Sequence, residues 1–200
     1  MIKLIYFDIG DVIVDCGHYF QKVCKDFNLD FDDFLAFYIQ HKHDLINGKI
    51  KTGEFWRKCV DYFHLKSAED YDFVKWWVSD YKPVKPIGKF IHNMAKKIEI
   101  GVISNINSGM WEEMIKTGLI PDIKYQKILL SCNLGIKKPN REIYELAQSE
   151  YRVRSEQILF VDNQEKNLVI PREMGWNTLL FDQTKPEEGV SEITKALSAK

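Results

Sequence analysis

Short apolar runs recur along the chain, and each of them ends at polar or glycine-bearing residues. The five runs span residues 2–7, 98–103, 127–130, 157–161 and 177–181. They are continuous and rich in β-branched residues, which is typical of strands buried on both faces of a parallel sheet. We therefore predict a sheet of four or five short parallel strands.

Between these runs, apolar residues recur at the three- and four-residue spacing of an amphipathic helix. Two stretches show it most clearly: Ile87, Phe90, Ile91, Met94 and Ala95 in the first, and Trp111, Met114 and Ile115 in the second. Strands that alternate with helices predict a doubly wound α/β fold with a Rossmann-like parallel-sheet core.

The interval 17–85 breaks this alternation, because it has no clear buried strand and several amphipathic helical stretches. The apolar stripes of these stretches begin at Tyr19, Phe34, Phe55 and Phe73. Thr52 is expected to cap the third helix, and Pro83 and Pro86 mark the return to the sheet. We predict a core domain of residues 1–16 and 86–200, with residues 17–85 inserted as an all-helical cap domain.

The composition of the chain indicates which kinds of binding partner to expect. The chain has 200 residues, of which 45% are hydrophobic and 28% charged, and its formal net charge is −1. This balance gives no electrostatic reason to expect nucleic acid or a membrane surface as a partner. We expect instead a small-molecule partner and a monomer or homodimer.

The N-terminus and the cysteines indicate a compartment. The chain opens on a predicted core strand without a signal peptide's n-region, and no apolar run approaches the roughly 20 residues of a membrane span. Its four cysteines are widely spaced and form no CxxC pair. We therefore expect a cytoplasmic protein with reduced thiols.

Polar residues stand at the carboxyl ends of the predicted strands, where an open parallel sheet binds its ligands. Asp8 follows the first strand, Ser104 and Asn105 follow the second, and Asp162 follows the fourth, while Lys138 precedes a later helix. A carboxylate can attack phosphorus, and a lysine and Mg²⁺ can compensate the negative charges that meet. This set predicts phosphoryl-transfer chemistry at one edge of the sheet.

At these positions the chain resembles the haloacid dehalogenase-like (HAD-like) hydrolases. Four segments match the four motifs of that family in order: residues 4–13, 102–105, 135–144 and 158–163, with Asn167 following the last. Each short motif is weak by itself, but four in order at strand ends are specific. A helical insertion between the first two motifs is similar to the C1 cap of subfamily I.

The resemblance implies a role for each matching residue. It makes Asp8 the catalytic nucleophile and places Asp8, the Gly10 carbonyl and Asp162 on a Mg²⁺ cofactor. Ser104 and Lys138 would bind the transferring phosphoryl group. Asn105 would support the turn of the second motif or reach the substrate.

Two positions depart from the family pattern. Phosphatases of the family usually carry a second aspartate, a general acid and base, where this chain has Gly10, although a sugar-phosphate phosphatase branch begins similarly. The adjacent Asp11 either replaces this missing acid or, as we rather expect, is a solvated loop carboxylate. Asn163 stands where the family often has a second acidic residue.

Two further features concern packing. Pro171 falls in a helical pattern, so that helix is expected to begin near Val169 or to kink. The Trp76–Trp77 pair is expected to pack inside the cap, with one ring free to line the site.

Three functions follow from this pattern. The first is a Mg²⁺-dependent phosphatase of small phosphorylated metabolites, such as a sugar phosphate. The second is a metal-independent dehalogenase, although the arginine that such enzymes carry soon after the first motif is missing here, since the first arginine is Arg57. The third is a metabolite-binding or regulatory protein of the same fold with little catalysis, which Gly10 and Asn163 favour.

Overall fold

The computed structural model describes residues 1–17, 19–65, 68, 71–149 and 153–198. Its main sheet has the strand order β5-β4-β1-β6-β7, and every neighbouring pair is parallel. The strands are β1 Leu4–Phe7, β4 Glu99–Ser104, β5 Ile128–Leu130, β6 Ile158–Asp162 and β7 Asn177–Leu180. The prediction of a parallel-sheet α/β fold is confirmed, and β1 lies at the centre of the sheet.

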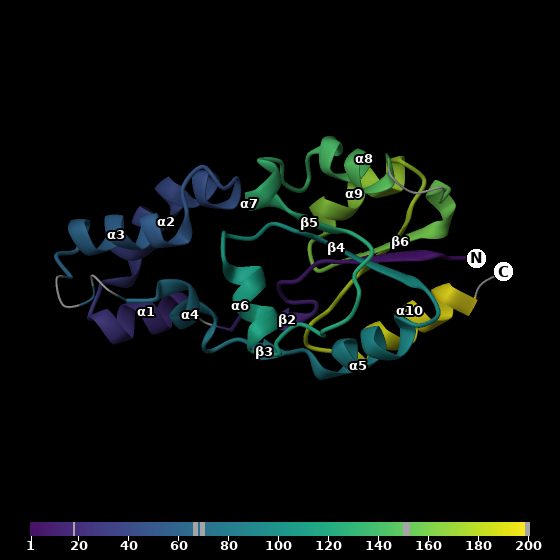
Figure 1. Ribbon diagram of the computed structural model, residues 1–200, viewed down its shortest axis with the longest axis horizontal. Coiled ribbons are helices and arrows are strands. Elements are labelled where there is room, and N and C mark those ends of the chain that lie inside the picture. The colour runs from purple at the N-terminus through teal and green to yellow at the C-terminus, as the bar shows by residue number, and fades with distance from the viewer. Residues whose placement is uncertain (18, 66–67, 69–70, 150–152, 199–200) are drawn as a thin grey trace.

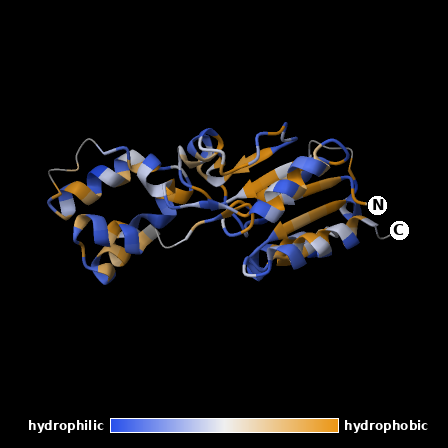
Figure 2. Ribbon diagram, turned by 90° about the horizontal axis from the view of Figure 1, so that it is seen from below, coloured by the Kyte–Doolittle hydropathy of each residue, from blue (hydrophilic) through white to orange (hydrophobic). Residues whose placement is uncertain are grey.

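Helices cover both faces of this sheet (Figure 1). On one face lie α5 Lys85–Met94 and α10 Pro186–Ser198, which contact each other. On the other lie α8 Arg141–Ser149 and α9 Glu165–Glu173. The residues of β1 alternate between two apolar clusters, with Ile5 and Phe7 in one and Leu4 and Tyr6 in the other, so β1 is buried on both sides, as its apolar run predicts. The strands are the apolar centre of this layered core in Figure 2.

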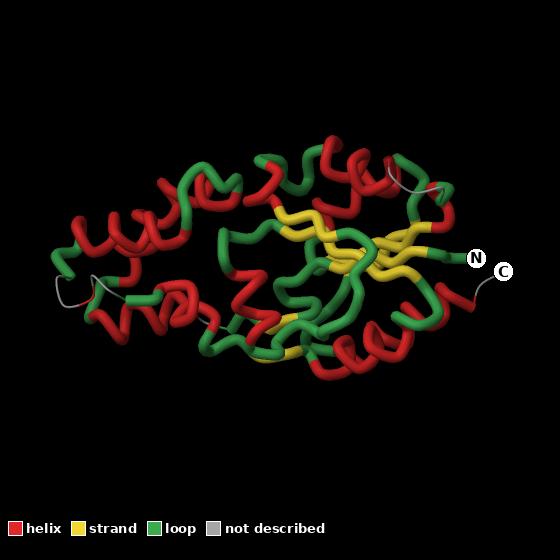
Figure 3. The backbone as a smooth tube through the Cα atoms, viewed as in Figure 1, coloured by secondary structure: helices red, strands yellow, loops and turns green. Residues whose placement is uncertain are grey.

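Four helices stand apart from the sheet at the other end of the molecule (Figures 1 and 3). They are α1 Tyr19–Phe27, α2 Phe31–Ile46, α3 Thr52–Tyr62 and α4 Phe73–Val78. Aromatic side chains pack them together; the Trp56 and Phe73 rings stack with their centroids 4.3 Å apart. Helices therefore dominate the described part of the interval, as predicted, although it also contains the short strand Lys82–Pro83.

The chain passes between the two parts through a two-stranded ribbon. β2 Val14–Asp15 pairs antiparallel with β3 Lys82–Pro83. This ribbon lies close to the predicted boundaries at residues 16 and 86, which stay a prediction.

The helical part packs on the core through the α2–α3 turn and through α4, which contacts α6 Met110–Lys116. Thr52 was expected to cap α3, but it is the first residue inside the helix and its hydroxyl donates to the Ser108 carbonyl oxygen at 2.6 Å. Gly48 lies so close to the core that a Cβ atom there would be 1.8 Å from the Cys132 carbonyl oxygen.

Two short elements and the start of α9 remain to be described. α7 Ser131–Leu134 follows β5, and a 3-10 turn, Ser155–Gln157, precedes β6. α9 contains Pro171 but begins at Glu165, so the expected start near Val169 is wrong. Among the described residues, every helix falls short of the length and apolarity that a membrane crossing requires.

Candidate active site

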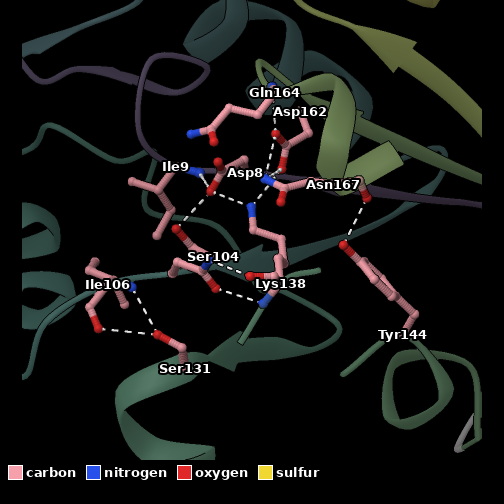
Figure 4. Close-up of polar contacts among 11 residues, drawn as sticks. Asp8, Ile9, Ser104, Ile106, Ser131, Lys138, Tyr144, Asp162, Gln164 and Asn167 are labelled. Carbon is pink, nitrogen blue, oxygen red and sulfur yellow. Dashed lines mark hydrogen bonds and ion pairs between the residues drawn. The ribbon is translucent and has the colours of Figure 1, made fainter. Parts of the chain in front are cut away.

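Polar residues at the carboxyl ends of three strands lie together at one edge of the sheet. Asp8 directly follows β1, Ser104 ends β4 and Asp162 ends β6. Lys138 reaches the same place from the loop between α7 and α8, and the four side chains point toward one another in Figure 4. The structure therefore brings together the residues that the sequence predicts at the strand ends.

Lys138 bridges the two carboxylates. Its Nζ lies 2.9 Å from Asp8 Oδ1 and 2.6 Å from Asp162 Oδ2. The side chain of Lys138 is only 1% exposed, and those of Asp8 and Asp162 are 9% and 0% exposed. Two carboxylates and one ammonium group thus share a site that is nearly closed to solvent, and water screens them little.

The two oxygens of Asp8 have different surroundings. Oδ1 accepts from Ser104 Oγ at 2.7 Å and from the Ile9 backbone amide at 2.7 Å, in addition to its contact with Lys138. Oδ2 accepts no hydrogen bond from any residue that the structure describes. Burial raises the pKa of Asp8, as does the charge of Asp162, while Lys138 opposes both. Oδ2 is therefore the oxygen left for chemistry, on a carboxylate held in a fixed orientation.

Asp162 is held on its other side by α9. Asn167 Nδ2 donates to Asp162 Oδ1 at 3.0 Å and to Oδ2 at 3.1 Å, and the Gln164 backbone amide donates to Oδ1 at 2.8 Å. The sequence marks Asn167 only as part of the fourth motif. Asn167 stands five residues after Asp162, and a turn and the start of α9 lie between them. The contact depends on the geometry of that turn, which the sequence alone does not reveal.

Asn105 connects the second motif to the third. Its amide donates to the Lys138 carbonyl oxygen at 2.9 Å and accepts from the Lys138 amide at 2.8 Å. Asn105 was expected either to support a turn or to reach the substrate. Its hydrogen bonds go to the Lys138 backbone, so it supports the backbone there. These bonds fix the position of Lys138, whose ammonium group bridges the two carboxylates.

Gly10 and Asp11 lie in the loop that follows Asp8. Asp11 adopts a left-handed conformation with φ 57°, and its Oδ1 accepts from the Cys16 amide at 3.2 Å. Asp11 is half-buried, so it keeps contact with solvent, and its hydrogen bond also braces the loop. A Cβ atom at Gly10 would lie 3.4 Å from Cys16 Sγ, so the thiol stands beside the place where the family often carries an aspartate.

Comparison with known proteins gives a consistent fold. A D-ribitol-5-phosphate phosphatase of Bacteroides thetaiotaomicron is 28% identical over 213 aligned residues, which cover the whole of both chains. A predicted HAD-like family hydrolase of Porphyromonas gingivalis superposes with a TM-score of 0.76 over the full length of both chains, at 21% identity. The chain has the fold of the HAD-like hydrolases.

A second solved structure carries ligands. A HAD family enzyme of Bacteroides thetaiotaomicron, in complex with magnesium and inorganic phosphate, superposes with a TM-score of 0.69 at 20% identity. The match covers 92% of this chain and 96% of that one. No protein-family model matches the chain.

The donor set of this site fits Mg²⁺. Magnesium prefers oxygen ligands and usually keeps several waters, so one or two carboxylates suffice. Asp8 and Asp162 supply them, and Gly10 lines the same cleft. Asn163 Oδ1 and Asn167 Oδ1 are buried and accept no hydrogen bond within the described part of the chain. No cluster of three His, Cys, Asp or Glu that could hold a metal ion occurs among the described residues.

A cleft of about 480 Å³ opens over these residues, within the usual size range of small-molecule sites. The core contributes the polar residues described above, and the helical insertion contributes Tyr38, Lys42, Ile46, Trp77 and Tyr81. Trp77 lines the cleft and Trp76 does not, so one ring of the predicted pair faces the site. The sequence pattern does not single out the other four cap residues, because their positions depend on how the cap packs on the core.

Proposed function

We propose that the protein is a Mg²⁺-dependent phosphatase of small phosphorylated metabolites, with Asp8 as nucleophile. The observation that carries this proposal is the bridging of Asp8 Oδ1 and Asp162 Oδ2 by Lys138, which leaves Asp8 Oδ2 without a partner among the described residues. A carboxylate oxygen with fixed orientation beside a buried cation suits attack on a phosphate dianion.

The reaction runs in two steps. Asp8 Oδ2 forms a bond to phosphorus while the bond from phosphorus to the leaving oxygen breaks, and the leaving alkoxide takes a proton from water. A second water then attacks phosphorus and loses a proton to the hydroxide left by the first step. The bond to Asp8 breaks, and inorganic phosphate leaves with the Asp8 carboxylate restored. Bound Mg²⁺ supplies charge neutralisation to the phosphoryl oxygens.

The remaining residues have supporting roles in this scheme. Lys138 neutralises the phosphoryl oxygens and the two carboxylates, and Ser104 Oγ, which donates to Asp8 at 2.7 Å, is placed to donate to a phosphoryl oxygen. We assign Asp8, Asp162 and the Gly10 carbonyl as the Mg²⁺ ligands. Gly10 cannot move a proton, so the leaving group relies on water for its proton, and good leaving groups should react faster.

The substrate class is proposed from the relative and the cleft together. The similar Bacteroides thetaiotaomicron protein is a D-ribitol-5-phosphate phosphatase, and Tyr38, Lys42 and Trp77 line the cleft of about 480 Å³. Sugar and polyol phosphates fit this size and this mixture of aromatic and polar groups.

Phosphate release from an aryl phosphate and from a panel of sugar and polyol phosphates tests the proposal, with Mg²⁺ or EDTA in parallel. Turnover should require Mg²⁺, and Asp8→Asn should abolish it, because the amide keeps the shape and loses the nucleophile. Asp61→Asn, on the exposed face of α3, is the matched control. Turnover that survives in Asp8→Asn would refute the mechanism.

Two other results would favour the alternative functions. Halide release from a haloacid without added metal would favour the dehalogenase. Tight metabolite binding without turnover across the panel would favour a binding or regulatory protein.

A further inference from the structure

A proline inside α9 removes one of the hydrogen bonds of that helix. The amide of residue 171 would normally donate to the carbonyl oxygen of Asn167, four residues earlier. Pro171 has no N–H and therefore cannot make this bond. The Asn167 carbonyl is buried with its residue, which is 2% exposed, and a buried carbonyl needs another donor.

Tyr144 supplies that donor. Its hydroxyl, which comes from α8, donates to the Asn167 carbonyl oxygen at 2.7 Å (Figure 4). Tyr144 is fully buried. Burial raises the pKa of Tyr144, and the charges of Asp162 and Asp8 raise it further. The hydroxyl therefore stays protonated and remains a donor throughout the neutral range.

The residue that receives this bond also orients a catalytic carboxylate. Asn167 Nδ2 donates to both oxygens of Asp162, at 3.0 Å and 3.1 Å. A displacement of the Asn167 backbone moves this amide relative to Asp162. Tyr144, Asn167 and Asp162 thus form one continuous chain of contacts from the interior of the core to the cleft.

We propose that Tyr144 is a positioning residue for Mg²⁺ binding, which acts through the Asn167 carbonyl left without a helical donor by Pro171 and so sets the orientation of Asp162. This inference rests on the proposed function, since Asp162 is a metal ligand only in that account. Tyr144 itself touches neither metal nor substrate.

Magnesium titration by calorimetry, on the full chain without substrate, measures the effect directly. Tyr144→Phe removes only the hydroxyl, and we expect it to weaken Mg²⁺ binding about 10-fold, because loss of a residue that orients a metal ligand typically costs 10- to 100-fold in affinity. Tyr6→Phe is the matched control, since the Tyr6 hydroxyl is equally buried and donates to the Ala147 carbonyl oxygen at 2.8 Å, outside this chain of contacts. Tyr6→Phe should lower the melting temperature without changing Mg²⁺ affinity.

A second variant tests the route through Pro171. Pro171→Ala returns an amide hydrogen that can donate to the Asn167 carbonyl oxygen in the ordinary helical way. In that background Tyr144→Phe should therefore cost much less Mg²⁺ affinity than it does in the wild-type chain. This rescue is not expected if Tyr144→Phe acts by loosening the core in general.

The outcomes separate this inference from the proposed function. Weaker binding in Tyr144→Phe, rescued by Pro171→Ala and absent in Tyr6→Phe, would support it. Equal Mg²⁺ affinity in Tyr144→Phe and wild type, or a loss that Pro171→Ala does not reduce, would overturn it and leave the phosphatase proposal standing. A wild-type chain that binds no Mg²⁺ would overturn both.

Discussion

Replacement of Lys138 by methionine should destabilise the protein in a way that depends strongly on pH. Methionine keeps the length of the side chain but not its charge, so Asp8 and Asp162 lose the ammonium group that lies 2.9 Å and 2.6 Å from their oxygens. Both carboxylates stay buried, since the backbone that holds them is unchanged. The variant thus leaves two negative charges in a closed site without a cation.

The size of the effect follows from the burial of all three groups. Removal of one partner from a buried ion pair typically costs about 3–5 kcal/mol, because the other charge is left uncompensated. A native domain is stable by only about 5–15 kcal/mol. For a chain of this length, each kcal/mol lowers the melting temperature by about 2–4 °C, so the expected decrease at neutral pH is roughly 6–20 °C.

Acid should reduce this deficit. Burial and the charge of Asp162 already raise the pKa of Asp8 in the wild type, and loss of Lys138 removes the main opposing influence. A carboxyl with a raised folded pKa contributes stability that is fully present below its unfolded pKa, near 4, and is lost as pH rises through the folded pKa. The variant should therefore approach the wild type near pH 4 and fall furthest behind it at neutral pH.

Urea denaturation in EDTA at about pH 4.5 and about pH 7.5 measures both free energies of unfolding. Lys166→Met is the matched control, because Lys166 lines the same cleft but is exposed. Adding Asp8→Asn to Lys138→Met should recover much of the loss at neutral pH, since only one buried carboxylate then remains. Two results would refute this prediction. One is a loss of unfolding free energy in Lys138→Met that is equal at both pH values. The other is a loss no larger than that of Lys166→Met.

Three further predictions concern the loop after Asp8 and the contact between cap and core. Asp11→Asn keeps the oxygen that accepts from the Cys16 amide, so turnover should stay close to wild type; a loss of about 10²-fold or more would show that Asp11 is the general acid. Burial and the nearby charge of Asp11 raise the pKa of Cys16 to about 12, so at pH 8 only about one thiol in ten thousand is a thiolate, and alkylation followed by mass spectrometry should find Cys16 unmodified. Gly48→Ala should cost about 3 kcal/mol or more in urea denaturation, because Gly48 has φ 69° and an added Cβ would lie 1.8 Å from the Cys132 carbonyl oxygen; unchanged stability would show that the cap does not pack on the core at this point.

The parallel core is predictable from the sequence because its strands are continuous apolar runs that end in polar residues. The same logic places Asp8, Ser104 and Asp162 at one edge, since the carboxyl ends of parallel strands meet there. Lys138 is different: it stands in a loop, and only the order of the family motifs assigns it to the site.

The contacts that orient the site are not predictable from periodicity. Asn105 holds the Lys138 backbone and Asn167 holds Asp162, but both contacts depend on turn geometry that local sequence does not specify. From the sequence alone, Pro171 indicates only a late or kinked helix, because the sequence does not show that Tyr144, 27 positions earlier, supplies the missing donor. Cap residues such as Lys42 reach the cleft only through the packing of the cap on the core.

In the proposed mechanism, Asp8 becomes phosphorylated during turnover. Mass spectrometry of protein quenched in acid during turnover of an aryl phosphate with Mg²⁺ tests it most directly. One phosphoryl group on the peptide that carries Asp8, absent from the Asp8→Asn protein, is the predicted result. A phosphoryl group found on another residue during turnover would contradict this mechanism. So would a wild-type protein that carries no phosphoryl group, together with an Asp8→Asn protein that remains active.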